Sequence, residues 1–186
     1  FYYPELGTVY TFDGYSEQTI ESGGGNIFGT ELQFALPLNV VADFLDGFGI
    51  LGYYTHLDNN VKVDNQQADI IGLSDESYGI TAYFEKMGFE ARVSGNYRSE
   101  YTAEVRGGNN GLQNTSVLAT ELWDAQIGYD FGRGGFSGAL GGLGVFLSGS
   151  NLTNEPYVQF EHDDERQITR YSNYGRNYQL GLRYKF

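Results

Sequence analysis

The residues best suited to chemistry gather near the end of this chain, between residues 150 and 171. His162-Asp163-Asp164-Glu165 places an imidazole beside three carboxylates, and carboxylate oxygens suit calcium or magnesium. A calcium loop, however, spaces its ligands at alternate positions around a turn glycine, which this run does not do. A solvated acidic loop also explains the run, so we predict no metal site and no cofactor.

This sequence contains few residues that could support nucleophilic catalysis. The chain has two histidines, His56 and His162, and no cysteine. A serine hydrolase needs a histidine base beside its nucleophile, and only Ser150 with His162 offers that combination formally. We therefore expect no enzymatic activity.

Residues 156–171 combine aromatic rings, guanidinium groups and an imidazole in a segment much longer than a hairpin connection needs. An aromatic face can stack on a sugar ring or a catechol at low entropic cost, although the same rings also suit loop packing or an interfacial girdle. The residues predicted to contact a ligand are Tyr157, Phe160, His162, Arg166 and Arg170.

Composition narrows the class of protein. A net charge of -13 excludes nucleic acid as a partner, because phosphates would be repelled. The 27 glycines, 16 tyrosines and 13 phenylalanines favour an all-β fold. The longest apolar stretch, residues 34–51, is broken by Pro37, Asp43 and Asp46, so no segment suits a transmembrane helix. A mean hydropathy of -0.39 agrees with membrane strands, in which only every second residue is apolar.

The last residues show that alternation most clearly, because successive side chains of a strand point to opposite faces. One face carries Tyr178, Leu180, Leu182, Tyr184 and Phe186, and the other carries Asn177, Gln179, Gly181, Arg183 and Lys185. Similar patterns predict strands at 28–38, 78–84, 89–101 and 120–131. Residues 48–56 and 144–152 are predicted strands with unassigned faces, and residues 8–20 a partial strand.

The connections between these strands alternate in length, as in a barrel with short periplasmic turns and long outer loops. Short turns are predicted at 85–88, 132–142 and 39–47, and long polar loops at 58–76, 102–119 and 156–171. The charged residues predicted to face the lumen are Glu90, Arg92, Arg98, Glu100, Asp124, Arg183 and Lys185. The aromatic residues predicted to supply interfacial girdles are Tyr53, Tyr54, Tyr78, Tyr101, Trp123, Tyr157, Tyr171 and Tyr174.

Two stretches resemble the last strands of TonB-dependent outer-membrane receptors. They are Asn151-Leu152-Thr153-Asn154-Glu155-Pro156-Tyr157 and residues 174–186. The positions Gln179, Gly181, Tyr184 and Phe186 also resemble the signal that bacterial barrels present to their assembly machinery. The hairpin 78–101 and the Gly-Thr-Glu-Leu at 29–32 extend the resemblance over residues 25–186.

The resemblance implies an antiparallel transmembrane β-barrel segment, about seven or eight C-terminal strands of a 22-stranded barrel in the bacterial outer membrane. Residues 1–186 would then be the C-terminal part of the barrel domain, with the plug domain, the TonB box and the earlier strands absent. The implied function is active uptake of an oligosaccharide, ferric siderophore or similar ligand. The implied partners are the TonB complex acting through the missing N-terminal part, lipid and lipopolysaccharide, the barrel assembly machinery and the transported ligand.

Two other interpretations remain open. The chain is long enough for a complete eight-stranded outer-membrane barrel acting as an adhesin, an anchor or a lipid-modifying enzyme. A soluble β-sandwich binding module would require the terminal pattern to be a coincidence. The length of the parent gene would separate the receptor from the small barrel.

Overall fold

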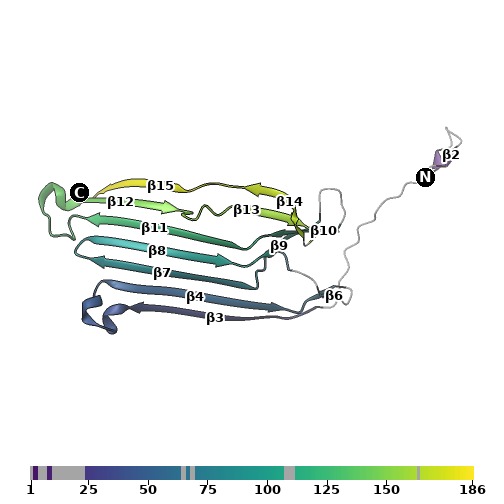
Figure 1. Cartoon of the computed structure of the whole chain (residues 1–186), viewed down its shortest axis with the longest axis horizontal. Coiled ribbons are helices and arrows are strands. Elements are labelled where there is room, and N and C mark those ends of the chain that lie inside the picture. Colours follow the sequence, from purple (N-terminus) through teal and green to yellow (C-terminus); the bar gives the residue numbers. More distant parts are fainter. Residues whose placement is uncertain are drawn as a thin grey trace.

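The computed structural model describes residues 2–3, 8–9, 24–63, 66–67, 70–106, 112–162 and 164–186. Seven long strands form one antiparallel sheet in the order β15-β12-β11-β8-β7-β4-β3, which we call the wall (Figure 1). They are β3 (Ile27–Pro37), β4 (Phe48–Asn59), β7 (Glu76–Lys86), β8 (Phe89–Arg98), β11 (Thr120–Asp130), β12 (Leu143–Ser150) and β15 (Asn177–Tyr184). The all-β prediction and the number of strands are confirmed.

The wall is a meander in which each long strand pairs with the long strands before and after it. Compact connections lie at its left end in Figure 1. They contain the 3-10 helices η1 (Leu38–Val40), η2 (Asp43–Leu45) and η3 (Gly138–Gly142) and the turn Met87-Gly88. The φ angles of Met87 and Gly88, 52° and 83°, are both positive, as the tightest β-hairpin turn requires. The predicted alternation of short and long connections is therefore confirmed.

The long connections at the opposite end are themselves hairpins. They contain β5 (Lys62–Val63) with β6 (Gln66–Gln67), β9 (Tyr101–Arg106) with β10 (Leu112–Val117), and β13 (Tyr157–Glu161) with β14 (Asp164–Ser172). The last two hairpins join through β10 and β13 into a second sheet, β14-β13-β10-β9, which we call the rim sheet. The prediction of loops at 102–119 and 156–171 is therefore wrong in secondary structure, although correct in position.

The rim sheet contains the buried apolar residues Val117, Val158 and Phe160.

Elsewhere, β1 (Tyr2–Tyr3) pairs with β2 (Thr8–Val9), and the rest of the partial strand predicted at 8–20 lies outside the described residues. No helix among the described residues combines the length and hydrophobicity needed to cross a membrane.

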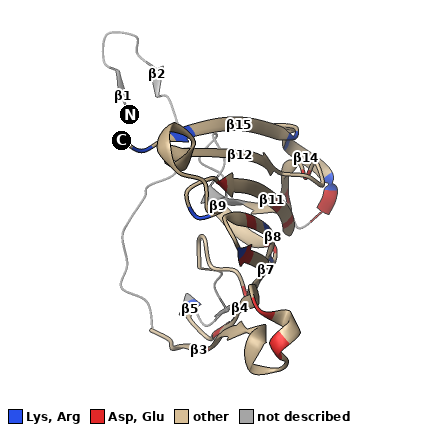
Figure 2. Ribbon diagram, turned by 90° about the vertical axis from the view of Figure 1, so that its left-hand side faces the viewer, with Lys and Arg blue, Asp and Glu red and all other residues tan. Residues whose placement is uncertain are grey.

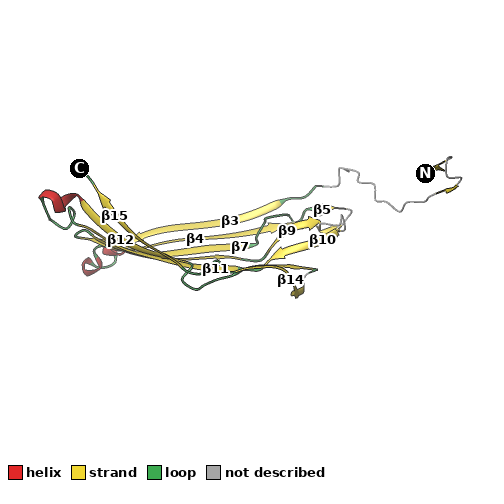
Figure 3. Cartoon of the chain, turned by 90° about the horizontal axis from the view of Figure 1, so that it is seen from above, coloured by secondary structure: helices red, strands yellow, loops and turns green. Residues whose placement is uncertain are grey.

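The wall curves (Figures 2 and 3), and the register of its strands gives it two contrasting faces. Its register brings one apolar row to a common face, which includes Phe34, Ile50, Ile80, Val93, Ile127, Leu147, Leu180 and Leu182. The opposite face includes Gln33, Thr81, Glu90, Arg92, Arg98, Asp124, Gln126, Gln179 and Arg183. The faces predicted for the C-terminal strand are confirmed, and Glu100 and Lys185 lie just beyond the ends of strands.

Register also assigns the two strands whose faces the pattern left open. In β4, Phe48, Ile50 and Tyr54 share the apolar face, whereas Leu51 and Tyr53 lie on the polar one. In β12, Leu143, Val145 and Leu147 are on the apolar face, and Phe146 lies opposite Gly181 on the polar face. Both strands therefore follow the same division as the rest of the wall.

Aromatic residues mark both ends of the apolar face. Next to the rim sheet, Tyr54 pairs with Tyr78 and Tyr78 with Tyr97, whose rings stack with centroids 4.7 Å apart. At the compact end lie Phe48, Phe84, Phe89, Tyr129 and Tyr184, and the Phe48 and Phe84 centroids are 4.5 Å apart. The girdle prediction is wrong for Tyr53, which lies on the polar face, and for Tyr101, Tyr157 and Tyr171, which lie in the rim sheet.

Five aromatic rings of the wall lie across glycines of adjacent strands. The directly opposed pairs are Gly49 with Tyr83, Gly52 with Phe34, Gly79 with Tyr53, Gly95 with Trp123, and Gly181 with Phe146. A β-carbon at each glycine would collide with the ring. Glycine therefore lets the rings lie flat against the wall and cover the exposed backbone.

Candidate functional site: the rim

A short segment before β7, residues 70–75, is held against the rim by Arg98. Its Nε donates to Ser74 Oγ and its Nη2 to the carbonyl of Gly72, both at 2.6 Å. The guanidinium carbon also lies 3.8 Å from the centroid of the Tyr101 ring, a cation-π distance. We call residues 70–75 the strap.

Backbone bonds fix the strap at both ends. The amide of Gly72 donates to the Thr102 carbonyl at 2.8 Å, and the amide of Leu57 donates to the Asp75 carbonyl at the same distance. An isolated bridge pairs Ser74 with Tyr101. The strap therefore connects β4 to the start of the rim sheet.

A cavity of about 560 Å³ opens between the strap, the end of β4 and the rim sheet. Residues that line it include His56, Asp75, Glu76, Ser99, Tyr101 and Ser116. The described lining residues include three carboxylates, since Glu100 joins Asp75 and Glu76, and no Lys or Arg. We call this space the rim cavity.

His56 lies near the end of β4 and is flanked by two carboxylates. Its Nε2 is 3.4 Å from Asp58 Oδ2 and its Nδ1 is 3.9 Å from Glu76 Oε1. The same Glu76 oxygen accepts a hydrogen bond from the Tyr54 hydroxyl at 3.0 Å. This site was not predictable from local sequence, because Glu76 is on another strand, 20 positions from His56.

The predicted ligand residues of 156–171 separate into two places. Arg170 lies over the Tyr157 ring, 5.5 Å from its centroid, and burial raises the pKa of that tyrosine. At the hairpin tip, Arg166 Nε and Nη2 each lie 2.8 Å from an oxygen of Asp164. His162 Nδ1 is 3.2 Å from Gln167 Oε1 in the same tip.

The structure changes the interpretation of two of those residues, Phe160 and Arg166. Phe160 is only 2% exposed, so its ring packs inside the rim sheet and has no face left for a ligand. Hydrogen bonds from the Arg166 guanidinium lower the pKa of Asp164 to about 2, so this arginine is already paired. Asp163 lies outside the described residues, among which no three His, Asp or Glu side chains are placed to hold a metal ion.

The Asn151 side chain organises the stretch that carries the family resemblance. Its Nδ2 donates to the carbonyls of Glu155 and Gly175, at 3.1 and 3.2 Å, and its Oδ1 accepts from the Glu155 amide at 2.7 Å. The Arg176 guanidinium donates to the Leu152 carbonyl at 2.8 Å. This stretch therefore forms a bend that joins β12 to the rim sheet. Its hydrogen bonds also attach the bend to the residues just before β15.

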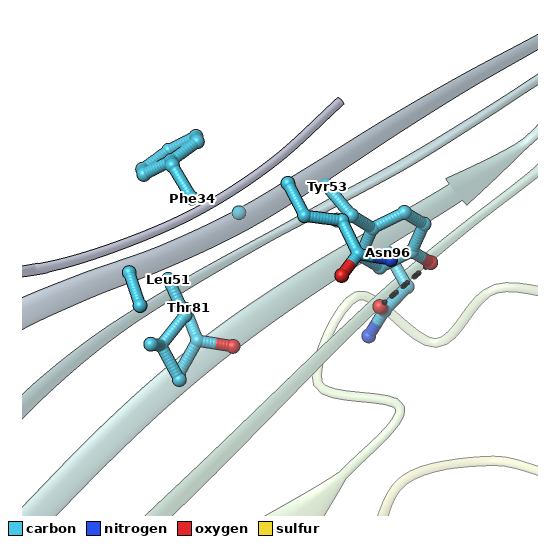
Figure 4. A pocket seen from close by; sticks show the side chains of 9 residues that line it. Phe34, Leu51, Tyr53, Thr81 and Asn96 are labelled. Atoms are coloured by element: carbon cyan, nitrogen blue, oxygen red, sulfur yellow. Dashed lines mark hydrogen bonds between the residues drawn. The ribbon is translucent and has the colours of Figure 1, made fainter. Parts of the chain in front are cut away.

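A second hollow, of about 630 Å³, lies against the wall (Figure 4). Its polar lining is uncharged and includes Gln33, Tyr53, Thr81 and Asn96, and the Tyr53 hydroxyl donates to Asn96 Oδ1 at 3.4 Å. The wall therefore presents neutral polar groups here, in contrast to the acidic rim cavity.

The fold of this chain is similar to part of a protein of known structure. The chain resembles part of a ferric citrate transporter. Its match to the crystal structure of unliganded FecA has a TM-score of 0.60 at 17% sequence identity, and covers 86% of this chain and 24% of the transporter. The chain thus spans about a quarter of that protein, and the likeness is one of fold. No family model and no curated protein matches the sequence.

The four residues of the predicted assembly signal lie at the end of β15 and just beyond it. Gln179 and Gly181 are on the polar face, and the Phe146 ring lies across Gly181. The Tyr184 and Phe186 rings meet edge to face with centroids 5.0 Å apart. Phe186 is fully exposed, and the role of this group as a signal stays a prediction.

Proposed function

We propose that this chain forms part of the barrel wall and outer rim of an outer-membrane transport receptor that takes up a small ligand. The observation that carries the proposal is the apolar face bounded by two aromatic girdles. From Phe89 to Tyr97 the face extends about 27 Å along β8, or about 20 Å along the membrane normal at a tilt of about 40°. The apolar band of outer-membrane barrels is about 25 Å tall.

The connections support the same orientation. Compact turns suit the periplasmic end, and the strap, the rim cavity and the rim sheet lie at the end that would face the medium. The fold shared with a ferric citrate transporter supports transport. We infer that the remaining strands and a plug domain belong to the same protein, and that TonB energises uptake.

The open edges favour a receptor over a complete small barrel. β3 and β15 are the two outermost strands of the wall, and no described strand joins them. A closed eight-stranded barrel would have to connect these edges. A wall continued by further strands needs no such closure.

The test replaces residues 159–170 with Asn-Gly in the full-length protein. Val158 pairs directly with Tyr171, so a two-residue turn can join them. We expect normal insertion, seen as heat-dependent migration on a gel, and reduced TonB-dependent growth on the cognate nutrient. Absence of the unmodified protein from the outer membrane would refute the proposal, and uptake unaffected by loss of TonB would refute its energetic part.

A further inference from the structure

Three large apolar side chains are exposed together in the connection between β3 and β4, which contains η1 and η2. The exposed fractions are 70% for Val40, 66% for Val41 and 83% for Phe44. Single exposed apolar residues are common on protein surfaces, whereas a contiguous group commonly marks contact with another molecule or with a membrane. We call these three residues the turn patch.

Backbone hydrogen bonds and an ion pair hold the turn patch in place. The amides of Val41 and Ala42 both donate to the Leu38 carbonyl, at 3.0 and 3.2 Å. Asp46 Oδ2 lies 3.1 Å from Lys86 Nζ, beside the tight turn between β7 and β8. That turn reverses the chain with two residues, so the connection that carries the patch is much longer than a reversal needs. The patch is therefore presented by a fixed and extended connection.

The turn patch continues the apolar face of the wall. Leu36 and Phe48, the apolar-face residues on either side of the connection, are both exposed, and Phe48 belongs to the aromatic group at the compact end. Figures 2 and 3 show η1 and η2 on the convex side of the wall, whereas η3 lies on its concave side. The convex side of a barrel wall is its outer side, which faces lipid.

The charges of this connection fit the surface of a membrane. Asp46 is paired with Lys86, and Asp43, the residue before Phe44, is exposed. A segment that lies on a membrane buries its apolar side chains about 5 to 10 Å into the boundary between headgroups and acyl chains, while its polar groups stay in water. The connection offers both kinds of group at the level of the aromatic girdle.

We propose that residues 38–47 form an interfacial anchor whose turn patch inserts into the periplasmic, phospholipid leaflet of the outer membrane. The anchor holds the ends of β3 and β4 at the membrane surface. The inference rests on the proposed function, because it requires the apolar face to lie in a membrane with the compact end toward the periplasm.

The experiment places a nitroxide spin label at Phe44→Cys in the full-length protein, cleared of any other cysteine and inserted into phosphatidylcholine vesicles. Oxygen concentrates in hydrocarbon and a water-soluble nickel chelate stays outside, so collisions with each reagent report the surroundings of the label. We expect frequent collisions with oxygen, few with the chelate, and a depth of about 5 to 10 Å below the headgroup boundary. Val41→Cys should give the same result at a second position.

Arg133→Cys is the control, because Arg133 is an exposed polar residue of the connection after β11 at the same end of the wall. Its label should collide with the chelate freely. A Phe44 label that meets the chelate as often as the Arg133 label lies in water, which would overturn the proposal. A Phe44 label shielded from both reagents is covered by protein, either a second copy or another part of the chain, and would overturn it as well.

Heat-dependent migration of the same samples distinguishes the two proposals. If the barrel has formed and the patch lies in water or under protein, the anchor is wrong and the proposed function stands. If the unmodified protein forms no heat-modifiable barrel in vesicles, the proposed function is wrong and the anchor with it.

Discussion

The indole of Trp123 lies flat over Gly95, the residue directly opposite it on β8. A β-carbon at Gly95 would come within 2.8 Å of the indole Cζ2 atom. The indole Nε1 also donates to Glu121 Oε1 at 2.8 Å, which fixes the ring from its edge. The ring thus fills the space that the missing side chain leaves on the apolar face.

Gly95→Ala should displace this ring and destabilise the protein by about 1 to 3 kcal/mol, as overpacking of a well-filled site does. The measurement is urea unfolding from lipid vesicles, followed by gel migration. Gly24→Ala is the control, since nothing lies within 4 Å of a β-carbon there. Equal stability of Gly95→Ala and the unmodified protein would show that the ring can move aside freely.

Val93 and Ser94 are neighbours that point to opposite faces of the wall. If the apolar face meets lipid, Val93→Arg should cost about 2 to 4 kcal/mol near the membrane midplane, whereas Ser94→Arg should cost much less. Vesicle-based unfolding of both variants tests this. A larger loss for Ser94→Arg would reverse the two faces.

Asn151→Ala should loosen the bend between β12 and the rim sheet by about 1 to 3 kcal/mol, because it leaves polar backbone groups without partners. The φ of Asn151 is 52°, so Asn151→Gly relieves the backbone strain and should lose less than the alanine variant. Protease sensitivity of the rim reports the effect. Asn154→Gly, also at positive φ, should leave the rim intact, and cleavage of that variant alone would argue against the role of Asn151.

The Asp164–Arg166 pair makes the hairpin tip sensitive to acid. Arg166 lowers the Asp164 pKa from 3.8 to about 2, so the pair contributes fully above about pH 3.8 and its contribution is lost as pH falls toward 2. Amide hydrogen exchange in β14 should therefore speed up across that window. Asp164→Asn should remove the pH dependence, and an Asp164 carboxyl that titrates at or above pH 3.8 would contradict the pairing.

The wall could be predicted because most of its strands alternate apolar and polar residues. Leu180 and Leu182 show it directly, whereas the faces of β4 needed the register with β3 and β7, since Leu51 and Tyr53 make both sides partly apolar. A pattern within one strand carries no information on its neighbours' alignment.

The rim was not predictable in the same way. Its sheet depends on pairing between Ser116 and Phe160, 44 positions apart in the chain, and the polar sequence around them resembles that of a loop. The contact of Arg98 with Ser74 and that of Asn151 with Gly175 likewise span 24 positions. Such contacts follow from the arrangement of the strands, which local sequence does not encode.

The meander also determines how this protein can be assembled. Each wall strand needs only its neighbours in sequence, so hairpins can be added one at a time at the free edge of β3 or β15, with little loop-closure entropy at each step. The contact of β10 with β13 is different, because it closes across the finished β11–β12 hairpin. The rim sheet therefore cannot be complete until the β11–β12 hairpin, which lies between its two halves in sequence, has formed.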